Sequence, residues 1–288
     1  MSLSRRVSSK LVLYPTDNVS EAAARQISLI IGSARCLPFS EYKPEYQDAY
    51  EYIVIGGSLD TTGTNEIARF INTNCQWLAW KEVALFSLGG DFKAAGKQLS
   101  EIAKPLATSV LAIEHIPGGE NGFDTADLVP VALRIRAKFR ERRKKMPPEE
   151  VKKMIEDLLK SEPYLVLATG CGANIRATTI GYSYQSGHVY AFCEGAEKFA
   201  NLLLNNRVAL AFYRMPEKDG LQASGTATIV YPGTVAYREM CALLGKDHGR
   251  LVSLPFNLNG LDIKLHKVEY YRADLRGQGY ESKQDHYF

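Results

Sequence analysis

The hydrophobic positions of the first 145 residues form short apolar runs that alternate with longer, helix-like stretches. The runs have the length of buried strands and cover residues 11–14, 52–55, 83–88 and 110–115. The helix-like stretches cover residues 20–31, 65–72 and 94–107. Buried residues of the first helix are expected to be Ala24, Ile27, Leu29, Ile30 and Ile31. Strands that alternate with helices predict a parallel sheet with helices on its faces.

A further amphipathic helix is predicted where Leu128, Val131, Ile135 and Phe139 recur at helical spacing. Pro147-Pro148 stops it and begins another helix, in which proline is tolerated in the first turn. The apolar stripe of that next helix comprises Val151, Met154, Ile155, Leu158 and Leu159. We therefore expect one domain over residues 1–146 and a second over residues 147–288.

The second half is dominated by strand patterns separated by Gly/Asn and Ser-Gly turns. Strands are predicted over residues 164–169, 176–184, 188–193, 208–213, 221–231 and, last, 263–274. Helices are predicted over residues 196–206 and 235–244, and the aromatic tail from residue 280 onward is expected to fray. Antiparallel strands with few helices predict a closed barrel. The expected fold class is thus a parallel α/β domain followed by a mainly antiparallel β-barrel.

Composition places the chain among globular proteins, because 45% of its 288 residues are hydrophobic and 23% are charged. No apolar run approaches the roughly 20 residues of a membrane span, and no apolar core follows Arg5 and Arg6 as a secretory signal requires. The five cysteines are odd in number and never form a C-x-x-C pair. We expect neither a disulfide framework nor a metal site, and a cytoplasmic location.

Residues 134–145 carry a net charge of +7, although the whole chain carries only +3. Dense Lys and Arg can bind a phosphate backbone, but Phe139 is the only aromatic residue among them. A solvated helix face is the favoured interpretation, and a nucleic-acid partner is not expected.

Three turns lie just past the carboxyl ends of predicted strands, at residues 15–20, 56–64 and 89–91. Ligands of open parallel sheets bind at this edge, and a helix N-terminus there suits phosphate. The segment from Tyr14 to Ala24 resembles the phosphate-loop plan of flavodoxins, and residues 53–58 and 122–125 resemble later segments of that family. Asp17 and Asn18 depart from it, and an acidic side chain repels phosphate. A scaffold or docking role therefore stays open beside a second flavin site.

The segment over residues 189–212 resembles the pyridoxamine-phosphate-oxidase-like, FMN-binding split barrel. The resemblance extends over about residues 148–275 and implies that Lys198, near the start of a helix, holds the FMN phosphate. Arg176 and Thr178, two residues apart on a strand, would assist it. The residues expected to line the flavin ring or the ribityl chain are Thr179, Cys193, Glu194 and Gln222.

Two positions depart from that family. Glu197 stands where a basic residue often precedes the lysine, and Gly220 aligns with a flavin-contacting glutamine of the oxidase. Gln222 lies two residues further along the strand, so it can face the same side.

The resemblance implies an FMN-dependent oxidoreductase that passes electrons from a nicotinamide or another small reductant to an acceptor. It also implies a homodimer formed through the barrel. No catalytic acid or base is assigned. Three alternatives stay open: a haem-binding or haem-degrading split barrel, a non-catalytic flavin carrier or sensor, and a scaffold whose basic helix docks a partner.

Overall fold

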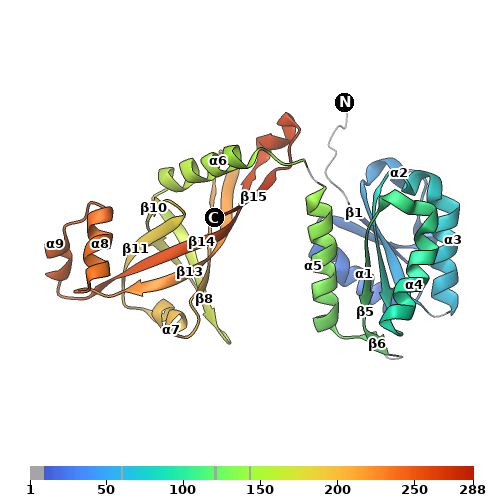
Figure 1. Ribbon diagram of the computed structural model, residues 1–288, viewed down its shortest axis with the longest axis horizontal. Coiled ribbons are helices and arrows are strands. Elements are labelled where there is room, and N and C mark those ends of the chain that lie inside the picture. Colours follow the sequence, from blue (N-terminus) through green and yellow to red (C-terminus); the bar gives the residue numbers. More distant parts are fainter. Residues whose placement is uncertain (1–9, 60, 120–121, 143) are drawn as a thin grey trace. The chain divides into compact units, whose positions relative to one another are not determined.

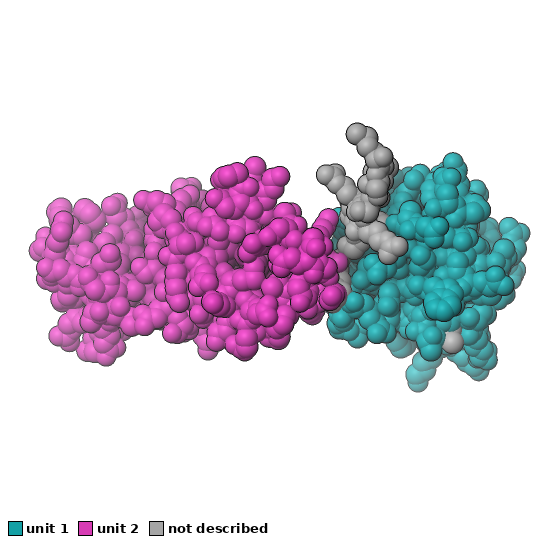
Figure 2. Space-filling model, turned by 90° about the horizontal axis from the view of Figure 1, so that it is seen from above, with its two compact units in different colours: residues 1–143 teal, residues 144–288 magenta. Residues whose placement is uncertain are grey.

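The computed structural model describes residues 10–59, 61–119, 122–142 and 144–288. The chain divides into two compact units, residues 1–143 and 144–288 (Figure 2). This division lies three residues before the boundary that the sequence predicts. Pro147 caps helix α6 (Pro148–Ser161) and Pro148 is its first residue, as expected for proline at a helix start. No helix in the described ranges is long and apolar enough to cross a membrane.

The first unit contains a five-stranded parallel sheet in the order β2-β1-β3-β4-β5. The strands are β1 (Lys10–Tyr14), β2 (Ala34–Pro38), β3 (Tyr52–Ser58), β4 (Glu82–Leu88) and β5 (Val110–Ile116). The strand β2 is missing from the sequence prediction. Only Leu37 of its five residues is buried, so this edge strand lacks the apolar run by which the others are found. The parallel α/β class is confirmed.

Helices cover both faces of this sheet (Figure 1). One face packs against α1 (Asn18–Ile31) and α5 (Thr125–Glu141), and the other against α3 (Thr61–Leu78) and α4 (Phe92–Ala103). The remaining short elements of the unit are α2 (Tyr46–Ala49), the 3-10 turns Phe39–Glu41 and Lys104–Ser109, and the two-residue strands β6 (Gly118–Gly119) and β7 (Gly122–Phe123). The expected burial of Leu29 is wrong, because it lies on the solvent side of α1, away from Ile27 and Ile31.

Helix α5 has the amphipathic character that the sequence predicts, since Leu128, Val131, Ile135 and Phe139 are all buried. Its basic side chains face outward, and several are paired with acids. Arg134 lies 2.6 Å from Glu114, Lys138 lies 3.1 Å from Glu141, and Arg142 lies 3.5 Å from Glu82. Arg143 falls outside the described residues. These pairs reduce the charge that the helix could offer to a nucleic acid.

The second unit contains an antiparallel sheet in the order β10-β11-β14-β13-β12-β8-β9, with β15 also paired to β14. Its strands are β8 (Tyr164–Cys171), β9 (Asn174–Gly181), β10 (Ser183–Gln185), β11 (His188–Glu194), β12 (Arg207–Arg214), β13 (Asp219–Val230), β14 (Leu258–Arg272) and β15 (Lys283–Tyr287). The sheet curls until β9, at one end of the path, contacts β11 near the other. Its concave side holds one continuous apolar core, to which α6 contributes four buried residues.

Three differences from the sequence prediction concern this unit. The strand predicted over residues 176–184 is two strands, interrupted at Tyr182. The strand predicted as the last one is followed by the 3-10 turn Ala273–Gln278 and by β15. The tail therefore does not fray: buried Gln284 in β15 accepts a 3.0 Å hydrogen bond from the backbone N–H of Met146. The other helices are α7 (Glu197–Leu204), α8 (Val235–Leu243) and α9 (His248–Val252).

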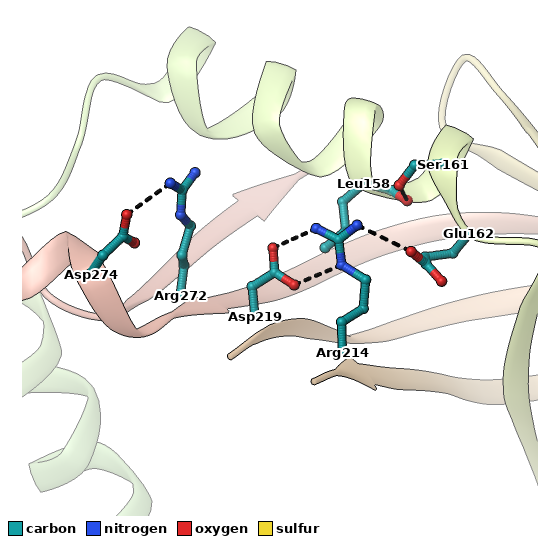
Figure 3. Close-up of polar contacts among 7 residues, drawn as sticks. All are labelled: Leu158, Ser161, Glu162, Arg214, Asp219, Arg272 and Asp274. Atoms are coloured by element: carbon teal, nitrogen blue, oxygen red, sulfur yellow. Dashed lines mark hydrogen bonds and ion pairs between the residues drawn. The ribbon is translucent and has the colours of Figure 1, made fainter. Parts of the chain in front are cut away.

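An ion cluster lies between the end of α6 and the β12–β13 hairpin (Figure 3). Arg214 forms two hydrogen bonds to the buried carboxylate of Asp219, of 2.8 and 2.7 Å, and a third of 3.1 Å to Glu162. The bonds to Asp219 raise the pKa of Arg214 above its ordinary value. Because Glu162 directly follows α6, the cluster ties this helix to the β12–β13 hairpin.

Candidate functional site

Lys198 provides a buried positive charge at the start of helix α7. Only 6% of the residue is exposed, and its Nζ donates a 3.1 Å hydrogen bond to the backbone oxygen of Glu194. No carboxylate pairs with it in the part of the chain that the structure describes. The N-cap residue is Ala196, so no side chain caps the helix. A lysine and free N–H groups at one helix end can together bind an anion.

Arg176 lies on the neighbouring strand β9 and reaches the same helix end. Its Nη1 is 2.6 Å from Oε2 of Glu197, the first residue of α7. Thr178 follows on the same face of β9, on which Ile180 continues into the core. Arg176 and Thr178 therefore face one side, as the two-residue spacing predicts. The resemblance assigns the guanidinium of Arg176 to phosphate, but in this structure it is paired with the carboxylate of Glu197.

Two asparagines fix α7 against the β8–β9 hairpin. The buried side chain of Asn201 donates a hydrogen bond of 3.2 Å to Oγ1 of Thr169 and accepts one of 2.8 Å from the side chain of Asn174. Asn205 donates 2.8 Å to the backbone oxygen of Gly170. These bonds hold the helix start in position beside β9. The sequence interpretation did not single out Asn201, whose polar side chain within an apolar helix face was the available signal.

Cys193 and Glu194 end the strand before α7. The thiol of Cys193 points into the core, where burial raises its pKa despite the opposing effect of Lys198. The thiol therefore stays protonated at neutral pH and does not supply a thiolate. The side chain of Glu194 is exposed, and its backbone oxygen is the group that holds Lys198.

Thr179 and Gln222 lie on the opposite, convex face of the sheet. The strand register aligns Thr179, Val166, Ala211, Gln222 and Glu269 in one row across five strands. The seven residues predicted for the site thus form two groups. Arg176, Cys193, Glu194 and Lys198 lie beside the start of α7, and Thr178 follows Arg176 on the inner face of β9, whereas Thr179 and Gln222 belong to the outer row.

A cavity of about 450 Å³ opens beside Gln222 on this convex face. It is lined by Val166, Ala211, Phe212, Tyr213, Gly220, Leu221, Gln222, Glu269, Tyr271 and Lys283. The rings of Tyr213 and Tyr271 are 6.2 Å apart, and Lys283 forms a 2.9 Å ion pair with Glu269. Five strands contribute to this wall, so only the folded register brings these residues together.

Gly220 has no room for a side chain. A Cβ atom there would overlap the backbone oxygen of Phe212 and lie 2.9 Å from Cα of Tyr213. The glutamine that the oxidase family places at this position would therefore displace β12. Gln222 is the nearest amide on the same face, and it borders the cavity.

The loop of the first unit that resembles a phosphate cradle is closed by its own side chains. Asp17 caps α1 by accepting a 2.7 Å hydrogen bond from the N–H of Ser20. The hydroxyl of Ser20, fully buried, accepts a 2.8 Å bond from the N–H of Ser58. The loop therefore presents a carboxylate, which repels phosphate, and a hydroxyl that is already hydrogen-bonded within the protein. These residues do not fit the phosphate of FMN.

Metal binding finds no support in the described residues, where no three His, Cys, Asp or Glu side chains come together as ligands. His188 instead pairs with Asp262 at 2.6 Å. The five cysteines are all free.

Comparisons with known proteins concern the fold alone. No protein family and no curated protein sequence matches the chain. Among solved structures it is similar to a putative pyridoxamine 5'-phosphate oxidase from Listeria innocua, at 15% identity over 43% of this chain and 99% of the other, with a TM-score of 0.35. A FAD-binding protein from Mesorhizobium loti is 16% identical, over 43% and 92% respectively, with a TM-score of 0.33. ChuZ from Campylobacter jejuni is 13% identical, over 59% and 69%, with a TM-score of 0.38.

Proposed function

We propose that the second unit is an FMN-binding split barrel of the pyridoxamine-phosphate-oxidase-like type and that the protein is a flavin-dependent oxidoreductase. The observation that carries this proposal is Lys198, a buried ammonium that contacts one carbonyl and the ring of Phe199 but pairs with no described carboxylate. Burying an unpaired charge is costly, so such a group favours a site that an anion completes. The curled course of the sheet and the position of α7 agree with this assignment.

In this proposal the phosphate binds between Lys198, the uncapped start of α7 and Arg176. Glu197 has to release Arg176 for the guanidinium to reach the phosphate. Because both side chains of that ion pair are about half exposed or more, the pair is weak and can exchange its partner. Asn201 positions the helix start, and Thr178 would assist with its hydroxyl.

The flavin ring is proposed to lie toward Thr179 and Gln222. Strand β9 ends the hydrogen-bonded path of the sheet, so a ligand beside it can touch both faces. When bound, FMN would supply two-electron redox chemistry at this edge. The protein would contribute amide and hydroxyl donors from Gln222 and Thr179, and the cavity beside Gln222 would admit a planar reductant such as a nicotinamide.

The convex face is proposed to bind a second copy of the chain. Tyr164, Val166 and Tyr213 are exposed on it next to the cavity, and large apolar residues grouped on a surface favour an interface. A homodimer would then cover the ring edge of the flavin. The first unit, with its 2-1-3-4-5 strand order, is proposed to be a flavodoxin-like scaffold without its own FMN, and the free cysteines agree with a cytoplasmic location.

The test is the absorption spectrum of the purified full-length protein, with quantification of the released chromophore. We expect flavin bands and one FMN per chain. The variant Lys198→Met keeps the apolar stem but loses the charge, so FMN affinity should fall about 10- to 100-fold in a fluorescence titration. Lys160→Met, which changes an exposed lysine of α6, is the matched control. A Soret band, or unchanged affinity of Lys198→Met, would contradict the proposal.

A further inference from the structure

A second cavity, of about 350 Å³, lies in the first unit at the carboxyl ends of β1 and β2. It is lined by Tyr14, Thr16, Asp17, Asn18, Glu21, Arg25, Cys36, Pro38, Ser40 and Glu41. These residues come from β1, the turn that follows it, α1, β2 and the 3-10 turn that follows β2. Ligands of doubly wound sheets bind at this edge. The volume falls within the range of small-molecule sites.

Tyr14 aims a polar group into this cavity. Only 4% of the residue is exposed, and in the described ranges its hydroxyl has no hydrogen-bond partner. Burial, Glu21 and Cys36 raise its pKa, while Arg25 lowers it. These neighbours all line the cavity, so the hydroxyl points into it. It stays protonated and can donate a hydrogen bond to a ligand.

The charges of the cavity are mainly negative. Its three carboxylates face a single guanidinium, that of Arg25, which already forms a 2.6 Å ion pair with Glu21. Burial raises the pKa of Cys36 to about 11, so its thiol adds no charge. Asp17 uses one oxygen to cap α1, and Glu41 has no partner among the described residues. The field therefore favours a cation and opposes a phosphate.

We propose that this cavity binds a small primary amine that carries hydroxyl groups. The ammonium would bind to Glu41 and to the free oxygen of Asp17. The ligand's hydroxyl groups would bind to the hydroxyls of Tyr14 and Ser40, of which the first would donate and the second can donate or accept. The turn at residues 15–20, which resembles a phosphate-binding loop, would thus bind a cation instead of an anion. This site is independent of the flavin proposed for the second unit.

The experiment compares three probes on the full-length protein: glucosamine, glucose and inorganic phosphate. Both tryptophans, Trp77 and Trp80, lie in the first unit, so their fluorescence reports its thermal unfolding alone. We expect glucosamine to raise the unfolding midpoint, as a ligand that binds only the folded state does, and glucose and phosphate to leave it unchanged. Hydrogen exchange should slow in peptides covering residues 14–25 and 36–41.

Two variants tie the effect to the cavity. Glu41→Gln removes an exposed charge and should weaken glucosamine binding about tenfold, and Tyr14→Phe, which keeps the ring, should weaken it severalfold. Glu51→Gln, an exposed acid at the start of the β3 segment, is the matched control and should bind like the parent. Equal stabilisation by glucose, stabilisation by phosphate, no stabilisation by glucosamine, or full binding by Glu41→Gln would each overturn the proposal.

Discussion

At the scale of single residues, the exchange of Arg176 between Glu197 and an anion decides how tightly the proposed site binds. The carboxylate of Glu197 forms a 2.6 Å ion pair with the guanidinium of Arg176 and also places a negative charge at the start of α7. A bound phosphate would have to overcome both effects. The side chain of Glu197 therefore opposes anion binding at the site proposed for Lys198 and Arg176.

Replacement of Glu197 should strengthen FMN binding. In Glu197→Gln the carboxylate is gone, Arg176 is free for the phosphate, and affinity should rise about 3- to 10-fold, as expected for one exposed charge at a helix start. Fluorescence titration with FMN at two salt concentrations measures this change in affinity. Glu239→Gln, an exposed acid on α8 of the same unit, is the control. Unchanged or weaker binding by Glu197→Gln would show that Glu197 does not compete with the ligand.

His115 gives the first unit a dependence on pH. It is buried at the end of β5, with Nδ1 3.0 Å from the hydroxyl of Ser87, and burial lowers its pKa below the ordinary 6.5. The unfolded chain therefore binds this proton more readily than the folded one does. The free energy of unfolding should be unaffected by this group above about pH 6.5 and should fall as the pH drops further.

Urea denaturation followed by tryptophan fluorescence between pH 5 and 7 measures this fall. His115→Gln removes the titrating group, so its stability should change less over the same interval than that of the parent. His286→Gln, in the second unit, is the control that should leave the tryptophan-reported pH dependence intact. The same slope in His115→Gln as in the parent would exclude His115 as its source.

The sequence predicts the residues of the proposed site one by one, but it does not predict how they are arranged. The helix start predicts Lys198, and the two-residue spacing correctly places Arg176 and Thr178 on one face. The ion pair with Glu197 depends on how α7 packs against β9, and the cavity wall from Glu269 to Lys283 depends on strand register. Register is set by pairing between distant segments, and no local pattern encodes it.

At the scale of elements, apolar content decides which strands the sequence reveals. Strands β3 and β4 are buried over almost their whole length and are found easily, whereas β2 shows one buried residue and is missed. Helix α1 is found, but its buried face is set by Ile27 and Ile31, four residues apart, which leaves Leu29 in solvent. Tail strand β15 is missed because its residues are mostly polar and pair only with β14.

The end of β3 is packed so closely that it tolerates only glycine. A Cβ atom on Gly57 would lie 2.6 Å from Cδ of Pro15 and would overlap the hydroxyl of Ser20. Gly57→Ala should lower the free energy of unfolding of the first unit by about 1–3 kcal/mol, as overpacking does. Gly96→Ala is the matched control in α4, where a Cβ meets nothing within 4 Å. Since alanine favours helix, this control should gain about 0.5–1 kcal/mol.

Urea denaturation with tryptophan fluorescence reports both variants, because both glycines and both tryptophans belong to the first unit. Equal stability of Gly57→Ala and the parent would mean that Pro15 and Ser20 can move aside. The Ser20–Ser58 bond would then be less rigid than the closed loop requires.

At the scale of the whole molecule, the order of two different architectures follows from the change in pattern at Pro147-Pro148. Alternating apolar runs and helices precede it, and successive strands with turns follow it. The spatial order of strands is a different matter. In the first unit β1 lies between β2 and β3, although β2 and β3 follow each other in the sequence. In the second unit β14 lies between β11 and β13. These long-range choices come from packing both faces of each sheet, which a local pattern does not contain.

The proposed dimer makes the convex face of the second unit the place to test assembly. Val166 lies in the row that joins Thr179 to Gln222 and is 38% exposed, with Tyr164 and Tyr213 exposed nearby. Val166→Glu puts a charge in the middle of this face without disturbing the core. Desolvating that charge in an apolar interface is costly, so the variant should sediment as a monomer at concentrations where the parent is a dimer.

Leu29→Glu is the control for adding a charge at an exposed apolar residue, since Leu29 is 81% exposed on α1 of the first unit. It should sediment like the parent. If the partner subunit also covers the flavin, Val166→Glu should bind FMN more weakly, while its circular dichroism stays that of the folded protein. A dimeric Val166→Glu, or a parent that is monomeric at every concentration tested, would show that this face does not join two copies. The exposed tyrosines would then belong to the ligand site rather than to an interface.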